Sequence, residues 1–259
     1  MASPRVFVQT LSVGLALLAG RAAAAQGVAP PPAARVEAGL EIDIGSLYLF
    51  RGLVYSAGPV TQSKAWASWG GLEVYGWTNV AVPAAPGART LDEVDTGASF
   101  AIERKGVAAV TSLDVYMYRL SGAERASGAP AHTIEASLAL SYTRGNTTVA
   151  AKQIADAGSY RGARFAQLGA SHTRALTPRV DLAVTALVGW ASRRFTRAYI
   201  GPDLAGLSLV TAGVSVTRHV GRLYLQPHLE VSVIPGSQRR AALVRPANVS
   251  VGLALGVTR

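Results

Sequence analysis

Nine carboxylates fall at alternate positions within segments that are otherwise apolar. They are Glu37, Glu41, Asp43, Asp95, Glu103, Asp114, Glu135, Asp181 and Glu230. A close pair of carboxyl groups could carry out acid–base catalysis. Their number and their spread along the chain favour instead a charged wall, whose members pair with one another or hydrate a channel. We expect Arg164 and His228 to be partners on that wall, with Gln226 facing the same way.

The four histidines, at positions 132, 172, 219 and 228, are far apart in the sequence. No two of them have the i,i+4 or His-x-His spacing that is typical of a metal site. The chain contains no cysteine, which excludes disulfides, thiolate catalysis and cysteine metal sites. We therefore predict neither a metal site nor a cofactor.

His132 is the one candidate for nucleophilic chemistry. It lies on the apolar face at the start of a predicted strand, where a lipid-hydrolysing barrel enzyme would need a Ser–His pair. The sequence shows no glycine-flanked serine motif beside it. A histidine at the rim is the simpler interpretation, and we predict that the protein is not an enzyme.

Arginines concentrate in the longer connections between the predicted strands. These arginines are Arg51, Arg89, Arg119, Arg125, Arg161, Arg193, Arg194, Arg197, Arg239, Arg240 and Arg245. The acidic residues in the same connections are Asp92, Glu124, Asp156 and Asp203. We expect Arg51, Arg193, Arg194, Arg197, Arg239 and Arg240 to form a cationic mouth. Such a mouth would attract anions, or bind the phosphates of lipopolysaccharide through bidentate arginine contacts.

The elements that must position these side chains are β-strands. In GRLYLQPHLEVSVIP, leucine and valine alternate with Tyr224, Gln226, His228 and Glu230, and strand side chains alternate with period two. Twelve segments show such a pattern: 36–51, 61–69, 72–82, 93–103, 107–119, 132–143, 147–154, 162–172, 180–191, 207–218, 223–233 and 248–258. Their number is even, and their lengths suit strands that cross a bilayer at a tilt.

The connections alternate between short turns and longer loops rich in glycine and proline. An outer-membrane barrel with both termini in the periplasm predicts this asymmetry, whereas a soluble β-sandwich does not require it. Tyr48, Phe50, Tyr142 and Trp190 are expected to lie in aromatic girdles at the membrane interfaces. Pro227 lacks a ladder donor, so we expect a local bulge there.

The first residues have the features of a secretory signal peptide. Arg5 precedes the apolar run VFVQTLSVGLALLAG, and Ala23-Ala24-Ala25 has the small-residue form of a cleavage site. We therefore expect a cleaved signal peptide over 1–25, a Pro/Ala-rich linker over 26–35 and the barrel over 36–259. Of the formal net charge of +10, Arg5 and Arg21 belong to the peptide. Export also argues against nucleic acid as the partner of this basic chain.

The stretch Tyr48–Val82 resembles the TorF-type porin family. In that family a strand ends in aromatic-x-Phe-Arg-Gly, a strand with an early glutamine follows, and a hairpin leads to Trp-x-x-Asn-Val or a similar ending. The matching residues here are Tyr48, Phe50, Arg51, Gly52, Gln62, Gly71, Tyr75, Trp77, Asn79 and Val80. The resemblance implies a small outer-membrane barrel with a pore function.

Together these patterns predict an all-β protein: a twelve-stranded, antiparallel, up-and-down outer-membrane barrel that acts as a passive porin for small solutes, which could be anionic. The expected partners are outer-membrane lipid, lipopolysaccharide, small solutes and, during biogenesis, the barrel-insertion machinery. Three alternatives stay open. They are a closed barrel with a structural or surface-interaction role, a lipid-modifying enzyme at His132, and a soluble secreted β-sandwich.

Overall fold

The protein forms a closed antiparallel β-barrel in the computed structural model, which describes residues 36–82 and 91–259. Within these ranges each wall strand pairs with its neighbour in sequence, and β1 pairs with both β4 and β14 to close the wall. The twelve wall strands are β1 (Glu37–Gly45), β4 (Val60–Trp69), β5 (Leu72–Ala81), β6 (Leu91–Arg104), β7 (Val107–Tyr118), β8 (His132–Arg144), β9 (Thr147–Asp156), β10 (Arg164–Thr177), β11 (Val180–Ala191), β12 (Gly206–Val220), β13 (Leu223–Val233) and β14 (Ala247–Thr258). The predicted fold class is confirmed, while the predicted signal peptide and linker lie outside the described residues.

Alternation along each strand separates an apolar outer face from a polar inner one. In β13, Leu225 and Leu229 point outward and are exposed, whereas Gln226 and Glu230 point inward and are buried. The same inversion of a soluble protein's pattern, with apolar side chains outside and polar ones inside, holds in β6, where Phe100 is exposed and Asp95 is buried. Large apolar side chains on the outside and carboxylates on the inside are compatible with a barrel whose outer surface contacts an apolar medium.

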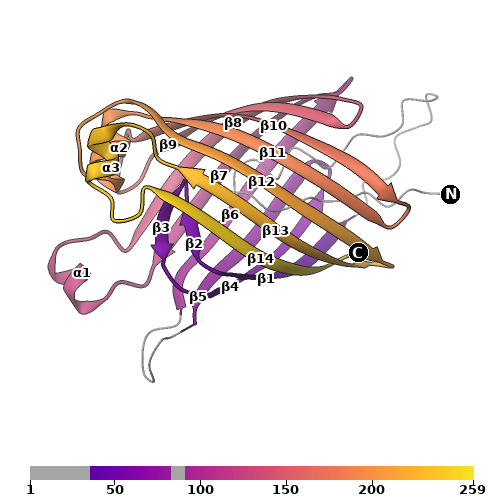
Figure 1. Cartoon of the computed structure of the whole chain (residues 1–259), viewed down its shortest axis with the longest axis horizontal. Helices are drawn as coiled ribbons and strands as arrows, with labels where there is room; N and C mark the ends of the chain where they lie inside the picture. The colour runs from indigo at the N-terminus through magenta and orange to yellow at the C-terminus, as the bar shows by residue number, and fades with distance from the viewer. Residues whose placement is uncertain (1–35, 83–90) are drawn as a thin grey trace.

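The two ends of the barrel differ, as Figure 1 shows. At the turn end, two-residue connections such as Gly70–Gly71 join the strands, and positive φ angles at both of these glycines suit a tight hairpin. At the loop end lie the longer connections, with the short helices α1 (Gly122–Ala126), α2 (Arg193–Tyr199) and α3 (Ser237–Ala241). In the part of the chain that the structure describes, no helix has the length and apolarity needed to cross a membrane.

The first predicted strand is wrong beyond Gly45. The chain bends at Ser46–Leu47 and forms a separate hairpin from β2 (Tyr48–Phe50) and β3 (Leu53–Ser56). Positive φ angles at Arg51 (53°) and Gly52 (80°) make the tight turn between these two strands. The hairpin lies inside the loop end of the barrel, where Tyr48 is buried against Trp77 and the half-buried Phe50 packs against Tyr116. Tyr48 and Phe50 therefore do not belong to an interfacial girdle, whereas Tyr142 and Trp190 do point outward.

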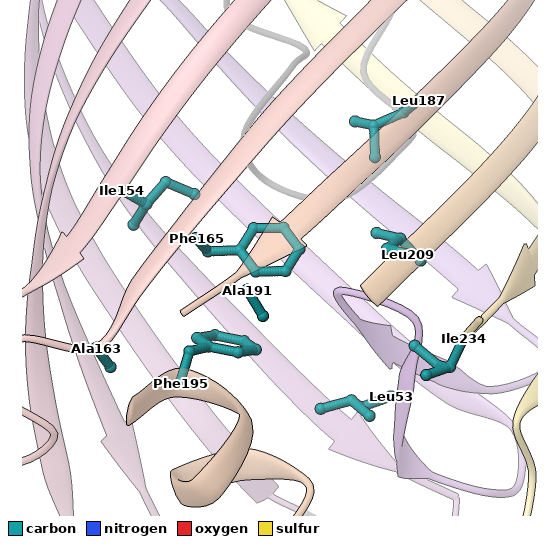
Figure 2. Close-up of a cluster of buried hydrophobic side chains, with 9 residues drawn as sticks. All are labelled: Leu53, Ile154, Ala163, Phe165, Leu187, Ala191, Phe195, Leu209 and Ile234. Carbon is teal, nitrogen blue, oxygen red and sulfur yellow. The ribbon is translucent and has the colours of Figure 1, made fainter. Parts of the chain in front are cut away.

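Among the described residues, two clusters of buried apolar side chains include the hairpin, and a third, of Val110, Ala139 and Ala150, lies on the wall without it. The first, drawn in Figure 2, joins the hairpin to α2 and to the opposite side of the barrel, formed by β8–β12 and called the far wall below. Its residues are Leu53, Ile154, Ala163, Phe165, Leu187, Ala191, Phe195, Leu209 and Ile234. The second joins the hairpin to the strands that follow it, β4 and β5, called the near wall below, through Tyr48, Val60, Trp66, Tyr75 and Trp77. The hairpin is thus packed on both sides and crosses the interior of the barrel.

The bulge expected at Pro227 is absent. Pairing between β12 and β13 is interrupted between Ser215–His228 and Arg218–Leu225, and the register is the same on both sides of the gap. Pro227 keeps its place opposite Leu253 on β14. The wall therefore tolerates the missing donor as a short gap in one ladder, with the proline ring on the exposed outer face.

Candidate channel interior and its constriction

Most of the predicted wall residues occupy inward-facing strand positions. These are Glu37, Glu41, Asp43, Asp95, Glu103, Asp114, Glu135, Asp181, Gln226, His228 and Glu230. The placement of Arg164 is wrong: the buried Phe165 takes the inward position, and Arg164 lies exposed on the opposite face at the loop end of β10. The predicted strand began too early, which left the facing of its first residues undetermined.

Several interior ionisable groups contact one another along the wall, either between adjacent strands or from β13 across β14 to β1. His228 Nε2 lies 3.0 Å from Asp43 Oδ1, and the Tyr224 hydroxyl donates to the carboxylate of Glu41. His219 Nε2 lies 3.2 Å from Asp181 Oδ2. The predicted role of His228 as a partner on the wall is thus matched by a specific contact. These contacts run along the wall and do not cross the barrel.

Five further charged residues face inward that sequence analysis did not place on the wall: Lys64, Glu73, Glu93, Lys152 and Asp156. Glu93 could have been found, because it shares the parity of Asp95 two positions later. Lys152 gave a weaker signal, because the alanines around it blur the alternation in that segment. Asp156 lies beyond the predicted end of its strand, which continues to Asp156 in the structure.

Arg51, at the tip of the hairpin, ties it to the far wall. Its Nη1 donates to Glu135 Oε1 at 2.9 Å, and its Nη2 contacts Glu135 Oε2, so that the pair is bidentate. Four strands separate β1 from β8 on one side of the ring and six on the other, so Glu135 lies nearly opposite the point where the hairpin leaves the wall. Arg51 is only 6% exposed, which corrects its predicted place in the cationic mouth.

Aromatic rings surround this ion pair. The Arg51 guanidinium carbon lies 4.5 Å from the centre of the Phe50 ring, 5.1 Å from Phe165 and 5.3 Å from Phe195. Tyr199 of α2 stacks on Phe195 at 4.5 Å. A guanidinium enclosed by ring faces and by a carboxylate is held by cation–π attraction as well as by hydrogen bonds. This arrangement forms a constriction at the loop end of the barrel interior.

The tip of the hairpin also requires a glycine. A Cβ at Gly52 would lie 2.5 Å from Leu209 Cδ1 and 3.0 Å from Ile234 Cδ1. Asn248 Nδ2 donates to the Gly52 carbonyl at 3.4 Å. The backbone at Gly52 therefore approaches the β12–β14 side of the wall more closely than a larger residue could.

The predicted cationic mouth is only partly formed. Arg193, Arg194, Arg197 and Arg240 are exposed at the loop end on α2 and α3. Arg239 is buried and donates to the carbonyl oxygens of Leu207 and Leu204, so it stabilises the loop rather than the mouth surface. The exposed set would still attract anions or the phosphates of a lipid headgroup.

His132 lies exposed on the outward face at the loop end of β8. Ser159 contacts it, but the Ser159 hydroxyl donates to the backbone carbonyl of His132 at 2.6 Å and not to the imidazole. This geometry does not activate a serine, because activation requires a hydrogen bond to the ring nitrogen.

No family model and no curated protein sequence matches the chain. Among solved structures it is similar to the NanC porin, with a TM-score of 0.52 and 9% identity over 84% of this chain and 98% of that one. It is also similar to the KdgM porin in complex with disordered oligogalacturonate, with a TM-score of 0.49 and 8% identity over 86% and 97% of the two chains. The COG4313 outer membrane channel from Pseudomonas putida F1 gives a TM-score of 0.48 and 10% identity over 90% and 100%. At such identities the likeness concerns the fold, a porin-type barrel.

Proposed function

We propose that the protein is an outer-membrane channel for the passive diffusion of small solutes. The observation on which this depends is the inverted wall of a closed barrel, with apolar side chains exposed outside and carboxylates, amides and hydroxyls inside. An interior of this kind is compatible with water and ions, while the outside is compatible with lipid. The inward hairpin then acts as the constriction that determines which solutes pass.

The same arrangement of apolar and polar faces supports a location in the outer membrane. Apolar faces on the strands suit a bilayer, and the longer arginine-bearing loops suit the outer surface, where lipopolysaccharide phosphates would meet Arg193, Arg194, Arg197 and Arg240. Export through a cleaved signal peptide and folding by the barrel-insertion machinery belong to the same proposal. The resemblance of Tyr48–Val82 to the TorF-type porin family supports it as well, since these residues form the hairpin and the near wall.

The charge of the solute is not determined by the mouth alone. Four exposed arginines favour anions at the entrance. An anion that passes them meets the inward carboxylates Glu93 and Asp95 on β6 and Asp114 on β7. The anion preference suggested by the mouth is therefore opposed within the barrel.

A second function is favoured by the packing at the loop end. The nine-residue apolar cluster in Figure 2 and the Arg51–Glu135 pair both join the hairpin to the far wall, as they would in a plugged barrel with a structural role. Such a barrel would insert into a membrane without conducting.

Single-channel recording separates the two functions. The mature protein, refolded in detergent and inserted into a planar bilayer, is expected to give discrete conductance steps. Heat-modifiable mobility on gels would first show that the barrel is folded. Folded, inserted protein that gives no steps would overturn the channel function in favour of the plugged barrel.

A further inference from the structure

We propose that Glu93 and Asp95, which lie beneath the hairpin, bind the ammonium or guanidinium group of a cationic solute; this rests on the proposed channel function and names the class of solute. The two residues are neighbours on the inner face of β6, near the loop end. In the register of the sheet, Asp95 lies between Trp77 on β5 and Tyr116 on β7. Both carboxylates thus occupy the wall at the level of the constriction.

The two carboxyl groups have unused acceptors. Glu93 is 2% and Asp95 1% exposed, yet Glu93 Oε1 and Asp95 Oδ1 have no hydrogen-bond partner among the described residues. The two side chains neighbour each other, and Glu93 also neighbours Tyr48. A buried acceptor without a donor is costly, and a ligand that donates N–H groups would satisfy it.

Three inward-facing basic groups could neutralise this pair, and each acts on other carboxylates; Lys152, on β9, acts on Asp114 and Glu135. Arg51 binds Glu135, and Lys64 Nζ lies 3.6 Å from Glu73 Oε1. The charged groups that act on Asp95 are themselves carboxylates: Glu93, Asp114 and Glu135. The potential at the pair is therefore negative, which excludes an anionic group and attracts a cationic one.

The surrounding rings favour an organic cation. Trp77 is the cross-strand partner of Asp95, and Tyr48 packs against Trp77 with ring centres 5.4 Å apart and against Tyr55 at 5.6 Å. Ring faces attract ammonium and guanidinium groups, particularly where water is excluded. Within residues 36–82 and 91–259 no group of three or more His, Asp or Glu side chains is arranged to hold a metal ion. The carboxylate pair with its rings fits a single ammonium or guanidinium group.

The first test is selectivity and block in planar bilayers. In a KCl gradient the reversal potential of the parent channel should have the sign of cation preference, and ethylammonium chloride should reduce the current in a saturable way. The double variant Glu93→Gln with Asp95→Asn keeps the volume and the hydrogen-bonding capacity but removes the charge. It should weaken the ethylammonium block by about tenfold, the ratio that corresponds to ~1.4 kcal/mol.

Glu103→Gln is the matched control, because Glu103 lies on the same inner face of β6 but is exposed at the turn end. It should leave the block as in the parent. A conducting parent that prefers anions, or a double variant that is blocked like the parent, would overturn the proposed site while leaving the channel function intact.

A binding measurement keeps the site testable if the protein does not conduct. The chain has four tryptophans, and Trp77 is the one paired with Asp95. In a variant with Trp66→Phe, Trp69→Phe and Trp190→Phe, the fluorescence of Trp77 should change saturably with ethylammonium, and Asp95→Asn should abolish the change. A silent channel with this response would contradict the channel function only. A Trp77 signal that is indifferent to ethylammonium would contradict the site.

Discussion

The loop half and the turn half of the barrel interior are held together by different kinds of contact. In the loop half, contacts cross the barrel: Arg51 of the hairpin binds Glu135, which is 84 residues away in sequence and nearly opposite in the ring. In the turn half, large side chains lie along the wall on the adjacent strand. Trp66 covers Gly39, and Tyr224 covers Gly256. Crossing contacts narrow the interior, whereas contacts along the wall fill it without spanning it.

Glycine makes the second kind of contact possible. A Cβ at Gly39 would lie 2.6 Å from the Trp66 indole, and one at Gly252 would lie 2.4 Å from the His228 ring. These glycines have inward positions on β1 and β14, where any side chain would push the ring toward the axis. The turn half of the barrel thus depends on small residues paired with large ones across one ladder.

The largest effect is expected from breaking the crossing contact. Arg51→Met keeps an apolar stem but leaves Glu135 buried without its partner, at a cost of about 3–5 kcal/mol. Because the hairpin is not part of the wall ladders, this cost should release the hairpin while the barrel remains folded. Single-channel conductance should therefore rise, and the variant should keep the heat-modifiable mobility of the parent.

Arg197→Met is the control for that experiment. Arg197 Nη2 and Asp203 Oδ2 also form an ion pair, at 2.6 Å, but their side chains are 63% and 46% exposed. An exposed pair contributes at most about 1 kcal/mol, so conductance should stay at the parent value. Equal conductance of the Arg51 and Arg197 variants would show that the crossing pair does not hold the constriction.

A smaller effect is expected in the turn half from Gly39→Ala. The new methyl group would displace the Trp66 ring from the wall, and overpacking of this kind costs about 1–3 kcal/mol. The midpoint of urea-induced unfolding, followed by gel mobility, should fall. Gly76→Ala on β5 is the matched control, because a Cβ there has no atom within 4 Å, and its midpoint should not fall. If both variants unfold at the same urea concentration, the ring–glycine contact does not stabilise the wall.

The same two halves show how far the sequence could be interpreted. The strands and their facing follow from period-two alternation, because neighbouring residues must point to opposite sides of a wall. His228 and Glu230 were placed inside on this basis alone, and the structure brings His228 to Asp43. Contacts along the wall are close to predictable, since they join neighbouring strands of the ring or, as for His228 and Asp43, reach across one intervening strand.

The contacts that cross the loop half were not predictable in this way. The alternation of Tyr48 and Phe50 continues that of β1, so the hairpin looked like the end of a strand. The decisive local feature is a positive φ at Arg51, which the identity of an arginine does not suggest. Its partner Glu135 is distant in sequence, and no local pattern encodes that contact.

The smallest effect is expected from a change in the backbone hydrogen bonds between β12 and β13 in the turn half. Pro227 leaves a gap between β12 and β13 without changing their register, so a residue with an N–H could close the gap with no other rearrangement. Pro227→Val should restore one hydrogen bond and raise the free energy of unfolding by about 0.5–1.5 kcal/mol. Leu229→Val, at an outward position on the same strand and outside the gap, controls for the change of side chain. A gain in the urea midpoint for Pro227→Val alone would show that the turn half is limited by its ladders. No gain would mean that the gap is already satisfied, and that the contacts along the wall, such as Trp66 on Gly39, determine its stability.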